Sequence, residues 1–295
     1  LSASLKFSIG LRWEDWEADY SDSLQESFNP TDKMSGGKIS LIKNMTNDTN
    51  MYASLAKGYK QGGFNLGLGL DANATNKNLA YDPEFLTNYE LGINTKLLDS
   101  RITFNGVLFY SDREDQQVLI STQTDPSDPN TFSFLTQNAA EGVNHGLEIN
   151  MDMDINQSLS AFVNLGILKT EIKNWQSRQD LEGRAQAHAP ERSYALGLNW
   201  APTSHTYLAI DFTGKSSFYY SDSHNNKSKS YVLTNLNLGY VKNNWNYELW
   251  ARNIFDEYYS VRGFYFGNEA PNFIDTLYER HGDPRHIGVS IRYDF

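Results

Sequence analysis

The stretch Val143–Ile155 (VNHGLEINMDMDI) carries the pattern that decides the fold. Every second residue from Leu147 to Met153 is apolar. The polar residues Glu148, Asn150, Asp152 and Asp154 alternate with them. Successive side chains of a β-strand point to opposite faces, so a period of two predicts a strand with one apolar and one polar face. Because the polar face carries full charges in succession, it must be in contact with water.

The same alternation recurs from one end of the chain to the other, and no convincing stretch shows the 3.6-residue period of a helix. About twelve strands are expected, many of them near the roughly 9–11 residues that cross a bilayer at a tilt. Their predicted ranges are 4–13, 37–45, 50–60, 85–98, 101–111, 143–155, 158–170, 191–201, 205–215, 229–241, 245–255 and 286–295.

The connections between these strands alternate between short and long. Outer-membrane barrels have short periplasmic turns and long extracellular loops. With that orientation, the first strand runs outward and the last ends in the periplasm, whereas a soluble β-sandwich has no reason to gather its long loops at one end. The short turns include 99–100, 156–157, 202–204 and 243–244, and the long polar loops are near 14–36, 61–84, 112–142, 171–190, 216–228 and 256–285.

Composition agrees with a membrane barrel and disfavours other classes. Hydrophobic residues make up 39% of the chain but aromatic residues reach 14%, with 18 Tyr. That balance suits a wall that is apolar on one face only and has aromatic girdles at both membrane interfaces. The formal net charge of −11 argues against a nucleic-acid partner, and the absence of Cys excludes disulfides. Girdle candidates are Trp13, Trp16, Tyr89, Tyr110, Trp200, Tyr240, Trp245, Tyr258 and Tyr259.

Five segments, in order, resemble the TonB-dependent outer-membrane receptors. They are Tyr52–Asn65 (YASLAKGYKQGGFN), Tyr81–Asn94 (YDPEFLTNYELGIN), Asn138–Ile149 (NAAEGVNHGLEI), Leu249–Tyr259 (LWARNIFDEYY) and the terminal strand Gly282–Phe295 (GDPRHIGVSIRYDF). The resemblance implies an all-β antiparallel transmembrane barrel of about 22 strands with a plugged lumen. Residues 1–295 would be its C-terminal portion, and the plug domain, the energy-coupling box and the N-terminal strands of the family pattern are absent from them.

The resemblance also implies a function and its partners. A receptor of this kind lies in the outer membrane of a Gram-negative bacterium and imports a ferric siderophore or another large nutrient. Its partners would be outer-membrane lipid, the TonB complex acting through the plug, the ligand, and the barrel assembly machinery. The residues present would form wall, lumen and loops and would perform no chemistry, so neither an enzyme nor a cofactor is expected. Ferric siderophore, haem, cobalamin and glycan importers share these wall segments, so the ligand stays open.

Aromatic and polar residues in the loops are the candidates for ligand contact, because they supply stacking and hydrogen bonds. Girdle packing and loop-to-loop contact are the alternative, and for any single residue it is favoured. The candidates are Tyr59, Lys60, Phe64, Asn65, Phe218, Tyr219, Tyr220, Tyr258, Tyr259, Phe264, Tyr265 and Phe266.

The resemblance further implies that Ile291, Tyr293 and Phe295 form the signal read by the assembly machinery, although they would also suit a simple barrel-closing strand.

No metal site is expected, because the six His are scattered and Asp112–Asp115 lacks the spacing of a calcium loop. Three alternatives to a plugged receptor stay open. They are a passive porin or complete small barrel of about twelve strands, an outer-membrane barrel hydrolase, and a soluble carbohydrate-binding β-domain.

Overall fold

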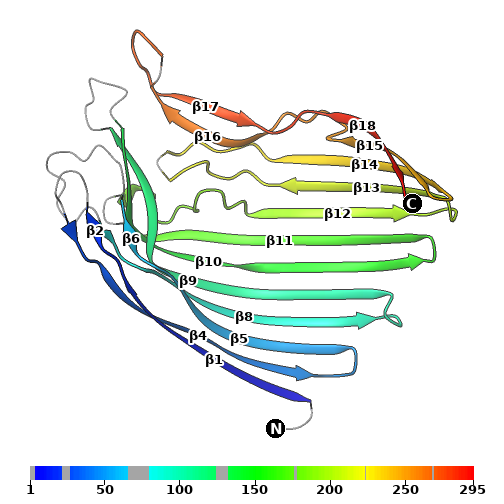
Figure 1. Cartoon of the computed structure of the whole chain (residues 1–295), viewed down its shortest axis with the longest axis horizontal. Coiled ribbons are helices and arrows are strands. Elements are labelled where there is room, and N and C mark those ends of the chain that lie inside the picture. Colours follow the sequence, from blue (N-terminus) through cyan, green and yellow to red (C-terminus); the bar gives the residue numbers. More distant parts are fainter. Residues whose placement is uncertain are drawn as a thin grey trace.

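A computed structural model of the chain describes residues 4–21, 27–65, 80–123, 132–175, 178–222, 224–267 and 269–295. Twelve strands form one curved sheet in which every neighbouring pair is antiparallel (Figure 1). In spatial order they are β1 (Leu5–Glu17), β4 (Thr31–Asn44), β5 (Thr49–Lys60), β8 (Glu84–Leu97), β9 (Ile102–Gln123), β10 (Phe132–Asn156), β11 (Leu159–Asn174), β12 (Arg192–Trp200), β13 (Thr206–Lys215), β14 (Tyr231–Lys242), β15 (Trp245–Arg252) and β18 (His286–Tyr293).

The remaining elements lie in the connections at one end of the sheet, on the left and upper left of Figure 1, opposite the short turns. They comprise three two-stranded pairs and one turn of 3-10 helix. These are β2 (Tyr20–Ser21) with β3 (Ser27–Phe28), β6 (Gly63–Phe64) with β7 (Ala80–Tyr81), β16 (Ser260–Phe266) with β17 (Thr276–His281), and η1 (Gln179–Leu181). No helix among the described residues has the length and apolar character to span a membrane.

The all-β fold and the twelve strands expected from the alternation are confirmed, each within a few residues of its range except at the loop ends. The loop expected at 112–142 is wrong for most of its length, because β9 continues to Gln123 and β10 begins at Phe132. The loop expected at 256–285 holds the β16–β17 hairpin. Alternation detects a strand only where one face is apolar, and these extensions carry polar residues on both faces.

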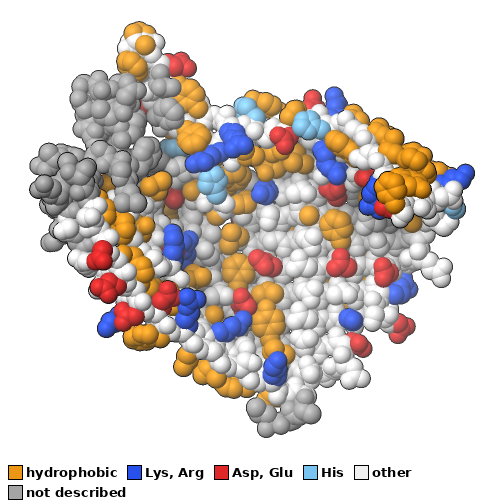
Figure 2. Space-filling model, viewed as in Figure 1, with side chains coloured by type: hydrophobic (Ala, Val, Ile, Leu, Met, Phe, Trp, Pro, Cys, Tyr) orange, Lys and Arg blue, Asp and Glu red, His pale blue; other side chains and the backbone are white. Residues whose placement is uncertain are grey.

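The two faces of the sheet differ as the alternation requires. The side chain of Leu11 is 85% exposed and that of Val289 is 68% exposed, and both belong to the apolar series of their strands. A soluble protein rarely exposes so extended an apolar surface. The opposite face is polar. The view in Figure 2 shows a mostly white surface across the strands, with charged side chains scattered over it and orange patches between them. This division suits a wall with lipid on one side and water on the other.

Turns at the short-loop end are tight and locally stabilised. Leu98, Asp99 and Ser100 all have positive φ, at 53°, 53° and 67°, which lets the chain reverse between β8 and β9. The next residue, Arg101, ties this turn to the neighbouring strand. Its guanidinium donates to the carbonyl oxygens of Asp154 and Ile155, over 3.0 and 2.6 Å.

Glycine is required within the ladder where two backbones approach closely. Gly146 on β10 pairs with Leu168 on β11, and a Cβ at this position would overlap the carbonyl oxygen of Ile167. That oxygen belongs to the backbone of the paired strand, so it cannot move aside without disturbing the ladder. Gly10 on β1 differs, because a Cβ there meets nothing within 4 Å.

The assignment of faces predicts opposite outcomes for two adjacent substitutions on β12. Leu196→Arg places a charge on the apolar face and should cost about 2–4 kcal/mol if that position lies near the middle of the bilayer. Ala195→Arg places the same charge on the polar face and should cost much less. Urea unfolding of the full-length protein in lipid vesicles measures both. Equal destabilisation by the two variants would show that the faces are wrongly assigned.

The close approach at Gly146 predicts that Gly146→Ala destabilises the protein by about 1–3 kcal/mol, the range for overpacking. The matched change Gly10→Ala should be neutral or slightly stabilising, because Ala restricts the unfolded chain more than Gly does. The same unfolding experiment compares them. A Gly146→Ala variant as stable as Gly10→Ala would mean that β10 and β11 separate at this point without cost.

Candidate functional site

Three connections at the loop end pack into one unit, here called the loop body: residues 178–191, residues 216–228 without 223, and the β16–β17 hairpin. Arg184 lies at its centre, with a side chain only 8% exposed. Its guanidinium donates to the carboxylate of Asp222 over 2.9 Å and to the amide oxygen of Asn225 over 2.9 Å. It also donates to the carbonyl oxygens of Ser221 and His224. One buried cation thus satisfies acceptors on Ser221, Asp222, His224 and Asn225, a role suited to the fixed fork of an Arg side chain.

Tyr219 is held between two cations. The Arg184 guanidinium lies 4.4 Å from its ring centroid and the Lys227 ammonium lies 4.1 Å from it. Both distances are within the range of a cation–π interaction. The Tyr219 carbonyl also accepts a hydrogen bond from the His188 backbone N–H over 2.9 Å. These contacts join the 178–191 segment to the 216–228 segment.

Tyr220 joins the hairpin to the same unit. It is 2% exposed, its ring lies against Gly263 of β16, and its hydroxyl donates to the Glu279 carboxylate of β17. Burial, together with the hydrogen bond to Glu279, raises the pKa of Tyr220 to about 12. The same hydrogen bond holds the pKa of Glu279 below its usual value. The pair is therefore a neutral phenol and a carboxylate at physiological pH, which keeps the contact closed.

A second network connects β9 and β10 to the chain beside them. Glu84, which is buried at the start of β8, accepts hydrogen bonds from Arg113 over 3.1 Å and from the backbone N–H of Gln117 over 3.0 Å. The Asn138 amide accepts from the Asp82 N–H over 2.6 Å and donates to the carbonyl oxygens of Asp82 and Asp115. The long hairpin formed by β9 and β10 is anchored at its base in this way.

Asn65 extends that network toward the top of the hairpin. Its amide donates to the Thr136 carbonyl over 3.0 Å and accepts from the Thr136 N–H over 2.7 Å. The side chain thereby pairs with the backbone of β10 as a neighbouring strand would. Phe64, the preceding residue, lies edge-on to Tyr20, with ring centroids 5.2 Å apart.

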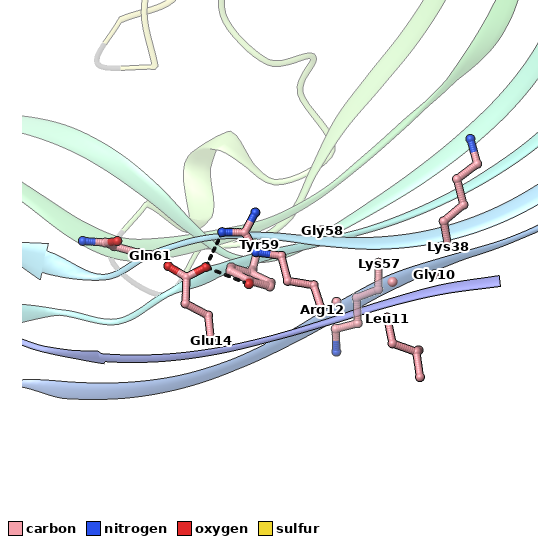
Figure 3. Close-up of a pocket in the computed structure, with 11 residues that line it drawn as sticks. Gly10, Leu11, Arg12, Glu14, Lys38, Lys57, Gly58, Tyr59 and Gln61 are labelled. Atoms are coloured by element: carbon pink, nitrogen blue, oxygen red, sulfur yellow. Dashed lines mark hydrogen bonds and ion pairs between the residues drawn. The ribbon is translucent and has the colours of Figure 1, made fainter.

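A groove of about 550 Å³ runs along the loop-end half of β1, β4 and β5 (Figure 3). The Tyr59 hydroxyl donates to Glu14 over 2.9 Å, and Arg12 donates to the same carboxylate oxygen while lying 5.6 Å from the Tyr59 ring centroid. In Figure 3 these three side chains converge, whereas Leu11 and Lys57 point to the other side of the strands. The groove therefore presents a phenol, a carboxylate and a guanidinium on one face, which suits a polar ligand rather than lipid.

A further groove of about 330 Å³ crosses β10 to β13 on the polar face. Its polar lining residues are Glu148, Asn150, Asn164, Ser193, Thr213 and Lys215. Within the described part of the chain, no three His, Asp or Glu side chains are close enough together to hold a metal ion.

The structure separates the sequence candidates into two groups. Phe64, Asn65, Phe218, Tyr219 and Tyr220 are packed against protein or hydrogen-bonded to it. Lys60, Tyr258, Phe264 and Tyr265 are exposed, and Tyr59 and Tyr259 are partly exposed. Of these, Tyr59, Tyr258 and Tyr265 also have protein partners, in Glu14, His281 and His224. Tyr259 lies 4.5 Å from the ring of Tyr231, while the side chain of Phe266 is outside the described part. Ligand contact by any of them stays a prediction.

Sequence reasoning missed the charged residues that organise these loops. Arg184, Asp222, Glu84 and Glu279 stand in polar segments with no motif or spacing that sets them apart. Their partners lie 29 to 59 positions away in the chain for Glu84 and Glu279. Such contacts depend on which loops the barrel brings together, so no local sequence pattern predicts them.

The C-terminal strand β18 pairs with β15 and exposes the side chains of Ile291 and Tyr293 on the apolar face. The Tyr293 ring lies 4.8 Å from Trp245 and 5.1 Å from Phe295, so the three form an aromatic cluster at the short-loop end. Recognition of Ile291, Tyr293 and Phe295 by an assembly machinery stays a prediction.

Comparison with known proteins agrees with this architecture. The family model for the β-barrel of TonB-dependent receptor-like proteins matches residues 1–254. The pesticin receptor of Yersinia pestis is 23% identical over 267 residues, which cover 88% of this chain and 36% of that protein.

Solved structures show the same fold. The ferric yersiniabactin uptake receptor FyuA of Yersinia pestis superposes with a TM-score of 0.79 at 19% identity, over 100% of this chain and 44% of that one. The siderophore receptor PiuA of Acinetobacter baumannii gives a TM-score of 0.74 at 19% identity, over 98% and 40%. The chain thus spans less than half the length of these relatives. The match of the family model over most of its residues shows that the chain belongs to the TonB-dependent receptor-like β-barrel family.

Proposed function

We propose that the chain forms the C-terminal wall and loops of an outer-membrane receptor that imports a ferric siderophore, or another large nutrient, with energy supplied through TonB. The observation that carries this proposal is the family match over residues 1–254 on a twelve-strand antiparallel sheet with one apolar face. Of the relatives, FyuA is named for uptake of ferric yersiniabactin and PiuA is named as a siderophore receptor. Import in the whole protein would also need a plug to couple to TonB.

In this proposal the loop body and the groove at Tyr59 take different parts in ligand capture. Arg184, Tyr219 and Tyr220 position the loops, because the Arg184 guanidinium binds Asp222, the Tyr219 ring contacts two cations and the Tyr220 hydroxyl donates to Glu279. Tyr265 and Phe264 contact His224 and Arg262 but are 44% and 42% exposed, so part of each ring remains available to stack on a chelate. The Arg12–Glu14–Tyr59 group would contact polar parts of a ligand on its way along the wall.

Catalysis has no part in this proposal. The relatives named above are receptors, and a receptor needs binding and passage rather than a nucleophile. The Ile291, Tyr293 and Phe295 cluster would serve insertion of the barrel, and the apolar face would contact outer-membrane lipid.

Deletion of the gene in its own bacterium tests the function. Under iron limitation, the deletion strain should lose uptake of at least one radiolabelled ferric chelate from a panel of catecholate, hydroxamate, phenolate and citrate complexes, and the intact gene should restore it. A protonophore should abolish the restored uptake, because TonB coupling draws on the proton gradient. Uptake that persists with the protonophore would support a passive porin instead. Normal uptake of every chelate in the deletion strain would remove iron chelates as the cargo.

The loop body predicts a specific effect of Arg184→Met. Losing the charged hydrogen bonds to Ser221, Asp222, His224 and Asn225 should weaken loop docking by about 1.5–3 kcal/mol. Hydrogen exchange at residues 216–222 should accelerate, and affinity for the transported chelate should fall. Arg178→Met is the matched control, because Arg178 forms its ion pair with Asp180 near the surface, whereas Arg184 supplies the hydrogen bonds to residues 221, 222, 224 and 225. Faster exchange with unchanged affinity would mean that the loop body takes no part in capture.

A further inference from the structure

A row of side chains crosses the apolar face near the loop end of the wall. Tyr89 on β8 pairs with Tyr110 on β9, which pairs with His145 on β10, which pairs with Lys169 on β11. Directly paired residues project from the same face. The Tyr89 and Tyr110 ring centroids are 6.3 Å apart, and those of Tyr110 and His145 are 6.2 Å apart. The row is thus a continuous aromatic band that ends in a cation.

The next row toward the middle of the wall is aliphatic until it reaches β12. Leu108, Leu147 and Ile167 follow one another across β9 to β11, and Ile167 pairs with Arg192. Arg192 is the first residue of β12, so it also lies at the loop end. Two cations, Lys169 and Arg192, therefore stand on adjacent strands as diagonal neighbours, roughly 7–8 Å apart at their Cα atoms.

Neither cation forms a close ion pair with a described carboxylate, although Glu171, two residues along β11 on the same face, interacts electrostatically with Lys169. On the same face of β11, Lys173 forms an ion pair with Glu171 over 2.8 Å. Lys57 of β5 also projects from the apolar face, and its ammonium lies over the Phe85 ring at 4.9 Å. Lys169 and Arg192 are exposed and appear in no ion pair in the described part of the chain. Asp112, on the same face, is two strands away from Lys169.

Position along the wall identifies the kind of partner. Tyr side chains gather at the depth of the lipid headgroups, so the Tyr89–Tyr110–His145 row marks that depth. Exposed Lys and Arg side chains at this depth attract anionic lipid headgroups. The long loops are on the cell-surface side of an outer-membrane barrel, which places the cations in the outer leaflet. A free soluble anion would have no use for the apolar surface of Ile167 and Tyr194 directly beside them.

We propose that Lys169 and Arg192 bind the phosphate of an anionic glycolipid of the outer leaflet, whose acyl chains lie along the apolar face of β11 and β12. This proposal rests on the outer-membrane location in the proposed function but not on what the protein imports.

Lipid retention by the full-length protein tests the proposal. The protein is purified from outer membranes in mild detergent and its bound lipids are counted by native mass spectrometry. Wild-type protein should retain phosphorylated glycolipid, and the double variant Lys169→Gln with Arg192→Gln should retain several-fold less. The control is Lys215→Gln, which removes a cation at the same end of the wall but on the polar face, and it should retain as much as wild type. Equal retention by the double variant and wild type would overturn the proposal.

A second measurement needs no variant and so does not depend on folding of the double variant. Wild-type protein is reconstituted in phosphatidylcholine vesicles with lipid A, or with lipid A from which the phosphates have been removed. Only the phosphorylated form should stay bound after re-extraction. Equal binding of both forms would exclude phosphate recognition, and equally tight binding of inositol hexakisphosphate without lipid would show a soluble-anion site instead. The chelate uptake assay is read separately, so loss of one proposal leaves the other measurable.

Discussion

Inside a bilayer no water reaches the backbone, so every N–H and C=O of a spanning strand needs a partner on the strand beside it. The continuous ladder from β1 to β18 meets this need for ten inner strands, each paired on both sides. Within the described residues, β1 and β18 each pair with one neighbour, and in lipid their outer edges require further strands. Face, register and turn all follow from the ladder. Successive side chains of a strand point alternately to lipid and to water. Position 146 requires Gly because the backbones of β10 and β11 come too close there for a Cβ.

The wall and the loops are stabilised differently. Side chains on the wall face lipid or water, whereas a cluster of buried apolar residues lies at the loop end, formed by Ala140, Ile172, Trp175 and Leu181. Buried charge gathers there too, in the Arg184–Asp222 and Glu84–Arg113 pairs. Loops outside the membrane cannot use lipid to order themselves, so they pack against one another. A rim that packs in this way can offer a ligand a surface with a defined shape.

Much of the wall was predictable from sequence, because a membrane-spanning strand has one apolar and one polar face and its apolar residues therefore recur at every second position. All twelve strands were found in this way, and the five family segments fell on strands or at their ends. The alternation did not predict the loop-end extensions of β9, after residue 111, and of β10, before residue 143, because polar residues lie on both faces there. The roles of the loop residues were less predictable than the strands. Asn65 and Tyr220 were singled out as possible ligand contacts, and the structure gives each a protein partner that sequence could not supply. Such pairings join segments that meet only after the barrel has formed.

The alternation of faces along the strands also limits which insertions a strand of the wall tolerates. Inserting one residue within β11 would turn Ile167 and Lys169 toward the water-filled side and bring Thr170 out to lipid, whereas inserting two would restore every side chain beyond them to its face. Loops outside the membrane have no such alternation of faces, so a loop can lengthen by any number of residues. Related proteins can therefore differ in the loops that recognise the cargo, while the strands of the wall keep the same side chains on the lipid-facing side.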